Sequence, residues 1–234
     1  MKLFNKICVP AALTLAMAAA VSCSDSDDEN AGWTELIKVA TYNIQYDNQS
    51  VEAGKWDNRK DLMQKMLKDC DFDIFGVQEP YKSQIDDIVS WFPEYGWVGA
   101  SISGESKKER VHYNPIFYRK DRFTVLDNGM FWYSETPEVV NSKGWDSYSV
   151  RMCNWVKFKD NRNGKIFFHF NSHFDHKGET ARLESAKLLV SKVKEIAADY
   201  PSFCTGDYNT DQTSAPYQII IMSDLMDSYS KAQY

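Results

Sequence analysis

The chain has 234 residues, of which 43% are hydrophobic and 14% aromatic, and its net charge at pH 7 is −6. This composition is enough for one well-packed domain and argues against a disordered chain. The acidic balance disfavours strong binding of duplex nucleic acid, because such binding depends on Lys and Arg side chains that neutralise phosphates.

The first 22 residues predict a secretory signal. Lys2 and Lys6 precede an apolar run over residues 7–21, which is too short to span a membrane as a helix and ends in small residues. Cys23 follows directly, so the segment resembles a lipoprotein signal in which Cys23 is the lipidated residue. It departs from that pattern at Ala20, where Leu is usual, and a plain secretory signal is the alternative. The expected location is the cell envelope, by a lipid anchor in the outer membrane, with surface exposure as a further reading.

Residues 23–35 predict an acidic tether. The run Ser-Asp-Ser-Asp-Asp-Glu-Asn at 24–30 resembles the acidic tags of surface-exported lipoproteins, and a plain solvated linker is the alternative. Without residues 1–22 the net charge is −8, and without the four acidic residues of the run 24–30 as well it is −4. The remaining cysteines have unrelated spacings, so they give no zinc pattern and at most one disulfide, and buried free thiols are favoured. They are Cys70, Cys153 and Cys204.

The hydrophobic pattern predicts one mixed α/β domain. Alternating or continuous apolar runs indicate strands over residues 36–44, 72–79, 95–98, 114–118, 123–126, 148–159, 165–172 and 203–206. Helical spacing indicates helices over residues 56–70, 81–92 and 179–200. Leu62 and Met66 mark the apolar face of the first helix, and Pro201 stops the last one. The turn at residues 161–164 predicts a hairpin.

Polar residues end four of these strands. Because side chains alternate along an extended segment, Asp207 and Asn209 share one face, and so do His173 and Asp175. Taken one at a time, these residues have simpler structural explanations. The Asn43 side chain could hydrogen-bond to the backbone, Glu79 could lie in a solvated loop, and residues 206–209 could form an ordinary turn. Together they are what an active site on a β-scaffold needs, since oxygen ligands hold a hard divalent cation and a carboxylate orients water. The residue types disfavour a zinc site.

Four motifs carry a resemblance to a known family. They occur in the order and rough spacing of the endonuclease/exonuclease/phosphatase superfamily, from about Lys38 to the end of the chain: Tyr42-Asn43-Ile44, Gly76-Val77-Gln78-Glu79, Asn171-Ser172-His173-Phe174-Asp175 and Gly206-Asp207-Tyr208-Asn209. The resemblance implies a four-layer α/β/β/α sandwich with the site at one end of the two packed sheets.

The same resemblance implies a role for each strand-end residue. Glu79 is expected to be the principal ligand of Mg²⁺, with Mn²⁺ as the alternative ion, and Asn43 to lie beside it at the metal and the phosphate. Asp207 is expected to position the attacking water, and Asn209 to orient Asp207 or the phosphate. His173 is expected to contact the phosphate and to stabilise the transition state.

Two further positions can be compared with the family pattern, and at one point the sequence departs from it. Arg151 opens a segment that resembles the family's Arg-x-x-x-Trp and would contact a substrate phosphate, with a surface salt bridge as the alternative. His112 stands where many relatives carry Glu, so no role transfers. The family closes with a further acidic strand and an Asp-His pair, and this sequence stops at Tyr234 without them. The resemblance therefore predicts that residues 36–234 form a fold incomplete at its C-terminus and a poorly active polypeptide.

The expected function is that of a Mg²⁺-dependent phosphoesterase tethered to the bacterial envelope. Its substrate would be a phosphate ester, monoester or diester, with a small phosphorylated or lipid-derived compound favoured over duplex DNA, and its membrane contact would be the lipid anchor only. The alternatives are an inactive gene fragment and a catalytically impaired surface binding module. In the module, tryptophans would serve as sugar platforms: Trp91, Trp97, Trp132 and Trp145. The sequence does not indicate an oligomeric state.

Overall fold

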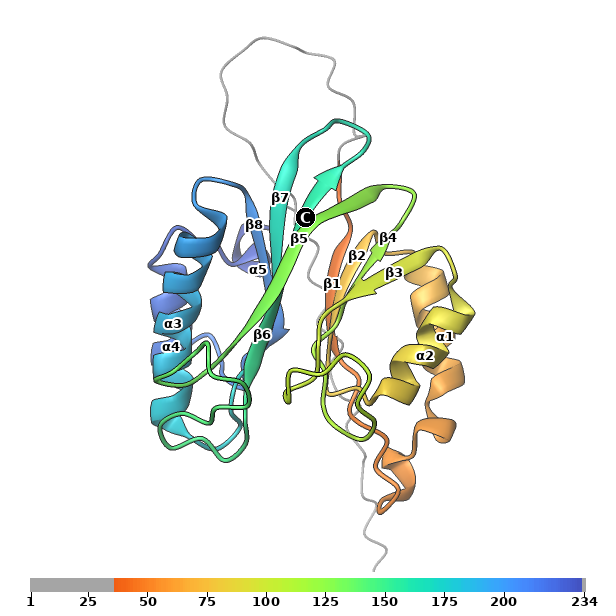
Figure 1. The fold of residues 1–234 in the computed structure, drawn as a ribbon, viewed down its shortest axis with the longest axis horizontal. Helices are drawn as coiled ribbons and strands as arrows, with labels where there is room; N and C mark the ends of the chain where they lie inside the picture. The colour runs from red at the N-terminus through yellow and green to blue at the C-terminus, as the bar shows by residue number, and fades with distance from the viewer. Residues whose placement is uncertain (1–35, 233–234) are drawn as a thin grey trace, which may run out of the picture.

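Two four-stranded sheets pack face to face, and helices cover their outer faces (Figure 1). The computed structural model describes residues 36–232, and the architecture over this range is the expected α/β/β/α sandwich. The predicted signal over residues 1–22, the lipidation site Cys23 and the tether to residue 35 lie outside the described residues. No helix between residues 36 and 232 combines the length and the apolar character that a membrane crossing requires.

The first sheet has the strand order β1-β2-β4-β3. Its strands and covering helices are β1 (Val39–Asn43), α1 (Lys60–Cys70), β2 (Ile74–Gln78), α2 (Lys82–Trp91), β3 (Tyr95–Val98) and β4 (Ile116–Arg119). Two 3₁₀ turns precede α1, namely η2 (Glu52–Gly54) and η3 (Trp56–Asn58). Strands β1 and β2 are parallel, and the other pairs are antiparallel.

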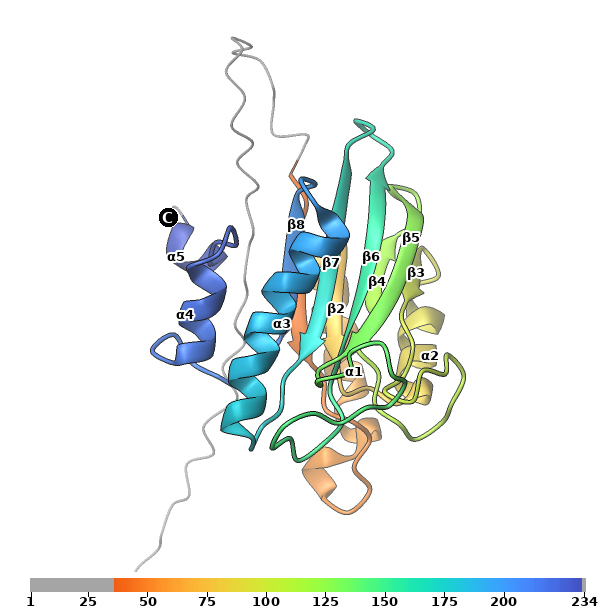
Figure 2. The same ribbon diagram turned by 60° about the vertical axis from the view of Figure 1, so that its left-hand side comes forward.

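The second sheet has the order β5-β6-β7-β8. Its elements are β5 (Phe123–Trp132), β6 (Met152–Asp160), β7 (Ile166–His173), α3 (Glu179–Ala197), β8 (Ser202–Asp207), α4 (Ala215–Ile221) and α5 (Ser228–Lys231). The hairpin β6–β7 is antiparallel, as predicted, whereas β7 and β8 are parallel. Helix α3 lies along the outer face of this sheet (Figure 2).

Three apolar clusters hold the layers together. One lies between the first sheet and its helices, one lies between the second sheet and α3, and a third joins the two sheets through residues such as Ile74, Ile116 and Phe158. The four tryptophans considered as sugar platforms belong to this packing. Trp132 is only 4% exposed, and the other three are partly buried against the first two clusters.

The buried face of the first helix differs from the prediction. Leu62 is 74% exposed, whereas Met63 and Leu67 are buried. The predicted helix started at Trp56, but residues 56–58 form the η3 turn and the α-helix begins at Lys60. A 3₁₀ turn has three residues per turn instead of 3.6, so extending α-helical spacing through it sets the wrong phase.

Strand β5 is also longer than predicted, because it continues to Trp132 instead of ending near Leu126. Its pairing with β6 shifts register between Val125 and Asp127. Such a bulge interrupts the alternation of polar and apolar residues, which hides the continuation of the strand from the sequence pattern.

The buried side-chain amide of Asn171 connects the two sheets by hydrogen bonds near the strand ends. Asn171 in β7 donates from Nδ2 to the backbone oxygens of Val77 (2.9 Å) and Pro115 (3.0 Å) in the first sheet, and its Oδ1 accepts from Gln78 Nε2 (2.7 Å). Gly76 makes room for it, since a Cβ at that position would lie 2.5 Å from Asn171 Oδ1. Because both ends of the amide are satisfied, the contact fixes the position of one sheet on the other.

A second buried polar group on β7 makes the fold sensitive to acid. His169 is fully buried, donates or accepts at Nε2 with Thr205 Oγ1 (2.7 Å), and has no hydrogen-bond partner at Nδ1 among the described residues. Burial lowers the pKa of His169 from 6.5 to about 3. Below pH 6.5 His169 is therefore protonated in the unfolded chain but stays neutral in the folded chain. The free energy of unfolding, which is at its full value above pH 6.5, decreases as the pH falls.

We expect His169 to remove about 2 kcal/mol of stability between pH 7 and pH 5, at about 1.4 kcal/mol per pH unit below 6.5. Urea unfolding of the wild type and of His169→Phe at both pH values measures this contribution, because phenylalanine fills the site without titrating. The wild type should lose about 2 kcal/mol more than the variant. Equal losses in the two proteins would show that His169 does not couple folding to pH.

Candidate functional site

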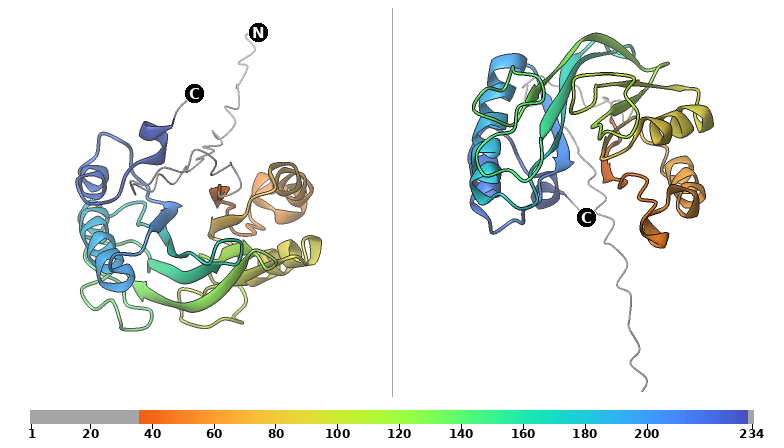
Figure 3. Two further views of the ribbon diagram at one scale, coloured as in Figure 1. Left: turned by 90° about the horizontal axis from the view of Figure 1, so that it is seen from above. Right: turned by 60° about the horizontal axis from the view of Figure 1, so that its bottom comes forward.

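The strand register brings the predicted site residues to one end of the sheets. In the first sheet Asn43 pairs with Gln78, and Glu79 follows directly. In the second sheet His173 pairs with Asp207 across two parallel strands. The strands that carry these residues, β1, β2, β7 and β8, all end at the lower side of Figure 1. The right-hand view of Figure 3 brings this side forward. Parallel neighbours place their carboxyl ends at the same edge, so the polar residues that follow the apolar runs come together.

One amide group joins the two carboxylates of the site. Asn43 Nδ2 donates to Glu79 Oε1 (3.1 Å) and to Asp207 Oδ2 (2.8 Å), so it links the first sheet to the second. Asn43 Oδ1 accepts from the backbone N–H of Gln45 (3.0 Å). The side chains of Glu79 and Asp207 remain 20% and 30% exposed. The expected carboxylate pair therefore forms and is open to solvent.

The donor set fits a hard divalent cation. Two carboxylates converge on one amide, and no Lys or Arg side chain within residues 36–232 makes an ion pair with either of them. Such oxygen ligands are those that Mg²⁺ prefers, and a cation would compensate the two negative charges. Residues 36–232 contain no group of three or more His, Cys, Asp or Glu side chains arranged to hold a metal, so any ion here would complete its shell with water or substrate. The amide presents its NH₂ to the carboxylates, and its oxygen would face them after a half-turn about the Cβ–Cγ bond.

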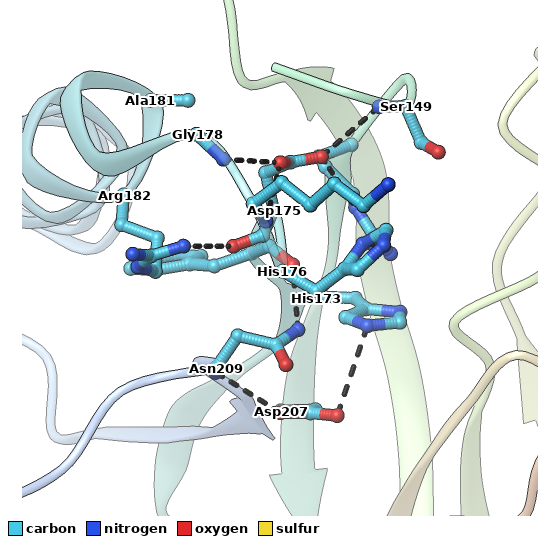
Figure 4. Close-up of polar contacts among 12 residues, drawn as sticks. Ser149, His173, Asp175, His176, Gly178, Ala181, Arg182, Asp207 and Asn209 are labelled. Carbon is cyan, nitrogen blue, oxygen red and sulfur yellow. Dashed lines mark hydrogen bonds and ion pairs between the residues drawn. The ribbon is translucent and has the colours of Figure 1, made fainter. Parts of the chain in front are cut away.

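His173 completes the cluster from the second sheet. Its Nε2 lies 3.9 Å from Glu79 Oε1 and 3.7 Å from Asp207 Oδ2, beyond hydrogen-bond distance of both. Figure 4 shows the pair with Asp207. Burial, followed by the nearby charge of Arg151, lowers the pKa of His173 to about 2. The imidazole is therefore neutral at physiological pH, and a neutral imidazole donates one hydrogen bond without adding charge.

The backbone at the site is held in an unusual conformation. Gln45, Glu79 and Asn209 have φ angles of 54°, 71° and 48°, in the left-handed region that non-glycine residues rarely adopt. Each costs about 1 kcal/mol or more and persists only where the surroundings fix it. All three residues follow directly or closely after strands that form the site.

Asn209 is fixed on both sides. Its backbone N–H donates to Asp207 Oδ1 (3.0 Å), and its Nδ2 donates to the backbone oxygen of Phe174 (2.9 Å). Figure 4 shows Asn209 between Asp207 and the segment that follows His173. Asn209 therefore orients Asp207 through its backbone, which is one of the two roles considered from the sequence.

Arg151 forms the salt bridge that was considered as an alternative, but the pair with Asp175 is buried and does not lie on the surface. The residue is 7% exposed, and its Nε lies 3.5 Å from Asp175 Oδ2. Burial alone would raise the pKa of Asp175, but backbone N–H groups of Gly178, Ser149 and Lys177 hold it well below its usual range. The ionised Asp175 therefore anchors the loop after β7, and its donors from Ser149 and Gly178 are visible in Figure 4.

Sequence reasoning missed His112 and its ring partners. The imidazole stacks on Tyr46 with ring centroids 5.0 Å apart and lies 5.7 Å from Tyr81. Burial lowers the pKa of His112, the nearby Glu79 opposes this shift, and Arg151 adds to it. His112 therefore lies within electrostatic reach of the site. A single His between loop residues gives no periodic signal, so only the fold could place it.

Comparisons with known proteins agree with this architecture. The model of the Endonuclease/Exonuclease/phosphatase family matches residues 40–232. An endonuclease/exonuclease/phosphatase from Bacteroides vulgatus is 41% identical with a TM-score of 0.76, over 81% of this chain and 72% of that one. The mannosyl-6-phosphatase of Bacteroides thetaiotaomicron is 40% identical with a TM-score of 0.74, over 79% and 69%. An uncharacterised protein of Acanthamoeba polyphaga mimivirus is 31% identical over 188 residues, 75% of this chain and 68% of that protein.

Proposed function

Because the chain belongs to the endonuclease/exonuclease/phosphatase family, we propose that it hydrolyses phosphate esters with the help of a divalent cation, Mg²⁺ in the first place and Mn²⁺ as an alternative. The family is typically dependent on divalent metal. The observation that carries the proposal is the convergence of Glu79, Asp207 and His173 around the Asn43 amide, without a cationic side chain paired to either carboxylate among the described residues.

The proposed division of labour follows from the contacts. Glu79 and Asn43 would hold the cation, which supplies neutralisation of the phosphate charge and polarisation of its oxygens. Asp207 would accept a hydrogen bond from the attacking water through Oδ2 and orient it, because the backbone N–H of Asn209 already fixes its Oδ1. His173 would donate from Nε2 to a phosphate oxygen, as a neutral group that needs no counter-charge.

Arg151 would contribute a positively charged side chain that contacts the substrate phosphate. Its charge interacts with both Glu79 and Asp207, which places the guanidinium within electrostatic reach of the carboxylates. A planar guanidinium suits phosphate oxygens, and a buried one acts in a low dielectric where each contact counts for more. This supports Arg151 as a phosphate contact.

For the substrate we propose a sugar phosphomonoester. The mannosyl-6-phosphatase that is 40% identical to this chain supports this class. The net charge of −6 disfavours long nucleic-acid substrates, whose binding needs many phosphate contacts by Lys and Arg. Trp132 is buried, and the other three tryptophans are partly buried against the cores, which disfavours them as the sugar platforms of a binding module. Attachment to the envelope through Cys23 stays a prediction from the sequence.

The assay that tests this proposal follows phosphate release from mannose 6-phosphate and 4-nitrophenol release from bis(4-nitrophenyl) phosphate, each with Mg²⁺ and with EDTA. We expect release from the monoester that EDTA abolishes and added Mg²⁺ restores, and a slower reaction with the diester. Metal dependence decides the outcome, whatever the absolute rate. Hydrolysis unchanged by EDTA would contradict the proposal, and faster hydrolysis of the diester would overturn the substrate class.

A further inference from the structure

The guanidinium of Arg151 is held along one edge and free at the other. Its Nε faces Asp175 Oδ2 at 3.5 Å, and its Nη2 lies 2.9 Å from His176 Nδ1. Nη1 makes no hydrogen bond to any residue of the described range, although it is not sealed from solvent as a buried orphan would be. Two of the three guanidinium nitrogens are therefore anchored, and the third, Nη1, is available to a ligand.

The second anchor comes from an exposed residue whose role no motif suggests. Arg has no acceptor, so the contact requires His176 Nδ1 to accept and places the ring hydrogen on Nε2. The imidazole itself is braced by Tyr148, with ring centroids 5.3 Å apart and an interplanar angle of 80°. Figure 4 shows His176 beside His173, on the loop that Asp175 anchors.

The geometry points to His176 as a positioning residue, which holds the Arg151 guanidinium so that its free Nη1 edge binds the substrate phosphate. This inference rests on the proposed function of the site. Without the Nδ1 acceptor, Arg151 keeps only the long contact to Asp175 and can rotate about its last side-chain bonds. A displaced guanidinium binds phosphate less well, while the carboxylates and the water that Asp207 orients stay in place.

Two variants of His176 separate its acceptor from its ring. His176→Asn retains a side-chain oxygen that can accept close to the position of Nδ1, and His176→Phe retains a ring against Tyr148 without an acceptor. We measure KM and kcat for mannose 6-phosphate, and the binding of inorganic phosphate by calorimetry. We expect His176→Phe to raise KM and to weaken phosphate binding by about tenfold with kcat within about twofold, and His176→Asn to restore most of both.

Coupling to Arg151 is the decisive control. Arg151→Met alone should weaken phosphate binding at least as much as His176→Phe, and the double variant should lose no more than Arg151→Met. Additive losses, or normal phosphate binding in His176→Phe, would overturn the inference, as would normal binding in Arg151→Met. If no ester is hydrolysed but phosphate binding follows this pattern, the proposed function fails and the positioning role stands. If phosphate does not bind and no ester is hydrolysed, both fail.

Discussion

Replacing Glu79 with glutamine is expected to lower Mg²⁺-dependent hydrolysis by about 10³-fold or more, equivalent to about 4 kcal/mol of transition-state stabilisation. Glutamine keeps the size of the side chain but removes the charge that a divalent cation requires. The Asn43 amide would then face only one carboxylate. Phosphate release measures the loss, and Mn²⁺ binding, followed by the relaxation of water protons, reports on the ion without relying on turnover.

The matched control is Glu195→Gln, which makes the same chemical change at an exposed residue of α3. Glu195 pairs only with Lys192 on the surface, so its replacement should change stability by less than about 1 kcal/mol and leave hydrolysis and Mn²⁺ binding intact. If Glu79→Gln keeps wild-type Mn²⁺ affinity, Glu79 is not the principal ligand. If hydrolysis is lost while phosphate binding persists, the site is that of an enzyme and not of a binding module.

The second large effect is on stability. Arg122 is 2% exposed, and its guanidinium bonds Asp160 Oδ2 at 3.0 Å and Asp73 Oδ1 at 2.8 Å. Arg122→Met leaves the buried Asp160 without a cation, so we expect the free energy of unfolding to fall by about 3–5 kcal/mol. For a domain of this size the midpoint of thermal denaturation should fall by about 10 °C. Urea unfolding and calorimetry measure the two quantities.

Arg162→Met provides the control, because Arg162 is an exposed residue of the turn between β6 and β7. That variant should stay within about 0.5 kcal/mol of the wild type. Adding Asp160→Asn to Arg122→Met removes the unpaired charge and should recover part of the loss. Equal stabilities of Arg122→Met and Arg162→Met would mean that the buried pair contributes nothing beyond a surface residue.

Local sequence patterns predicted most of the strands and helices because each buries a face against one layer. The hairpin between β6 and β7 followed from its turn residues and the apolar runs on both sides. The pattern failed where geometry changes within an element. The η3 turn shifted the phase of α1, and the bulge after Val125 hid the second half of β5. Neither irregularity alters composition, so neither is visible in the residues alone.

The candidate site was predictable in its membership but not in its contacts. Asn43, Glu79, His173 and Asp207 each follow an apolar run, and parallel strands carry such ends to one edge. Which atoms meet depends on how one sheet lies on the other, which no local pattern encodes. The same limit hid the Arg151–His176 contact, because twenty-five positions separate two residues whose types suggest no pairing.

The Asn171 amide joins two sheets that come from two consecutive halves of the chain, and each half supplies part of the candidate site. Residues up to Arg119 form the first sheet and supply Asn43 and Glu79, whereas residues from Phe123 onward form the second and supply His173 and Asp207. A fragment that folds as either sheet alone therefore holds half of the cluster. The intact cluster exists only while the two halves are docked, so the proposed activity would depend on the interface between them.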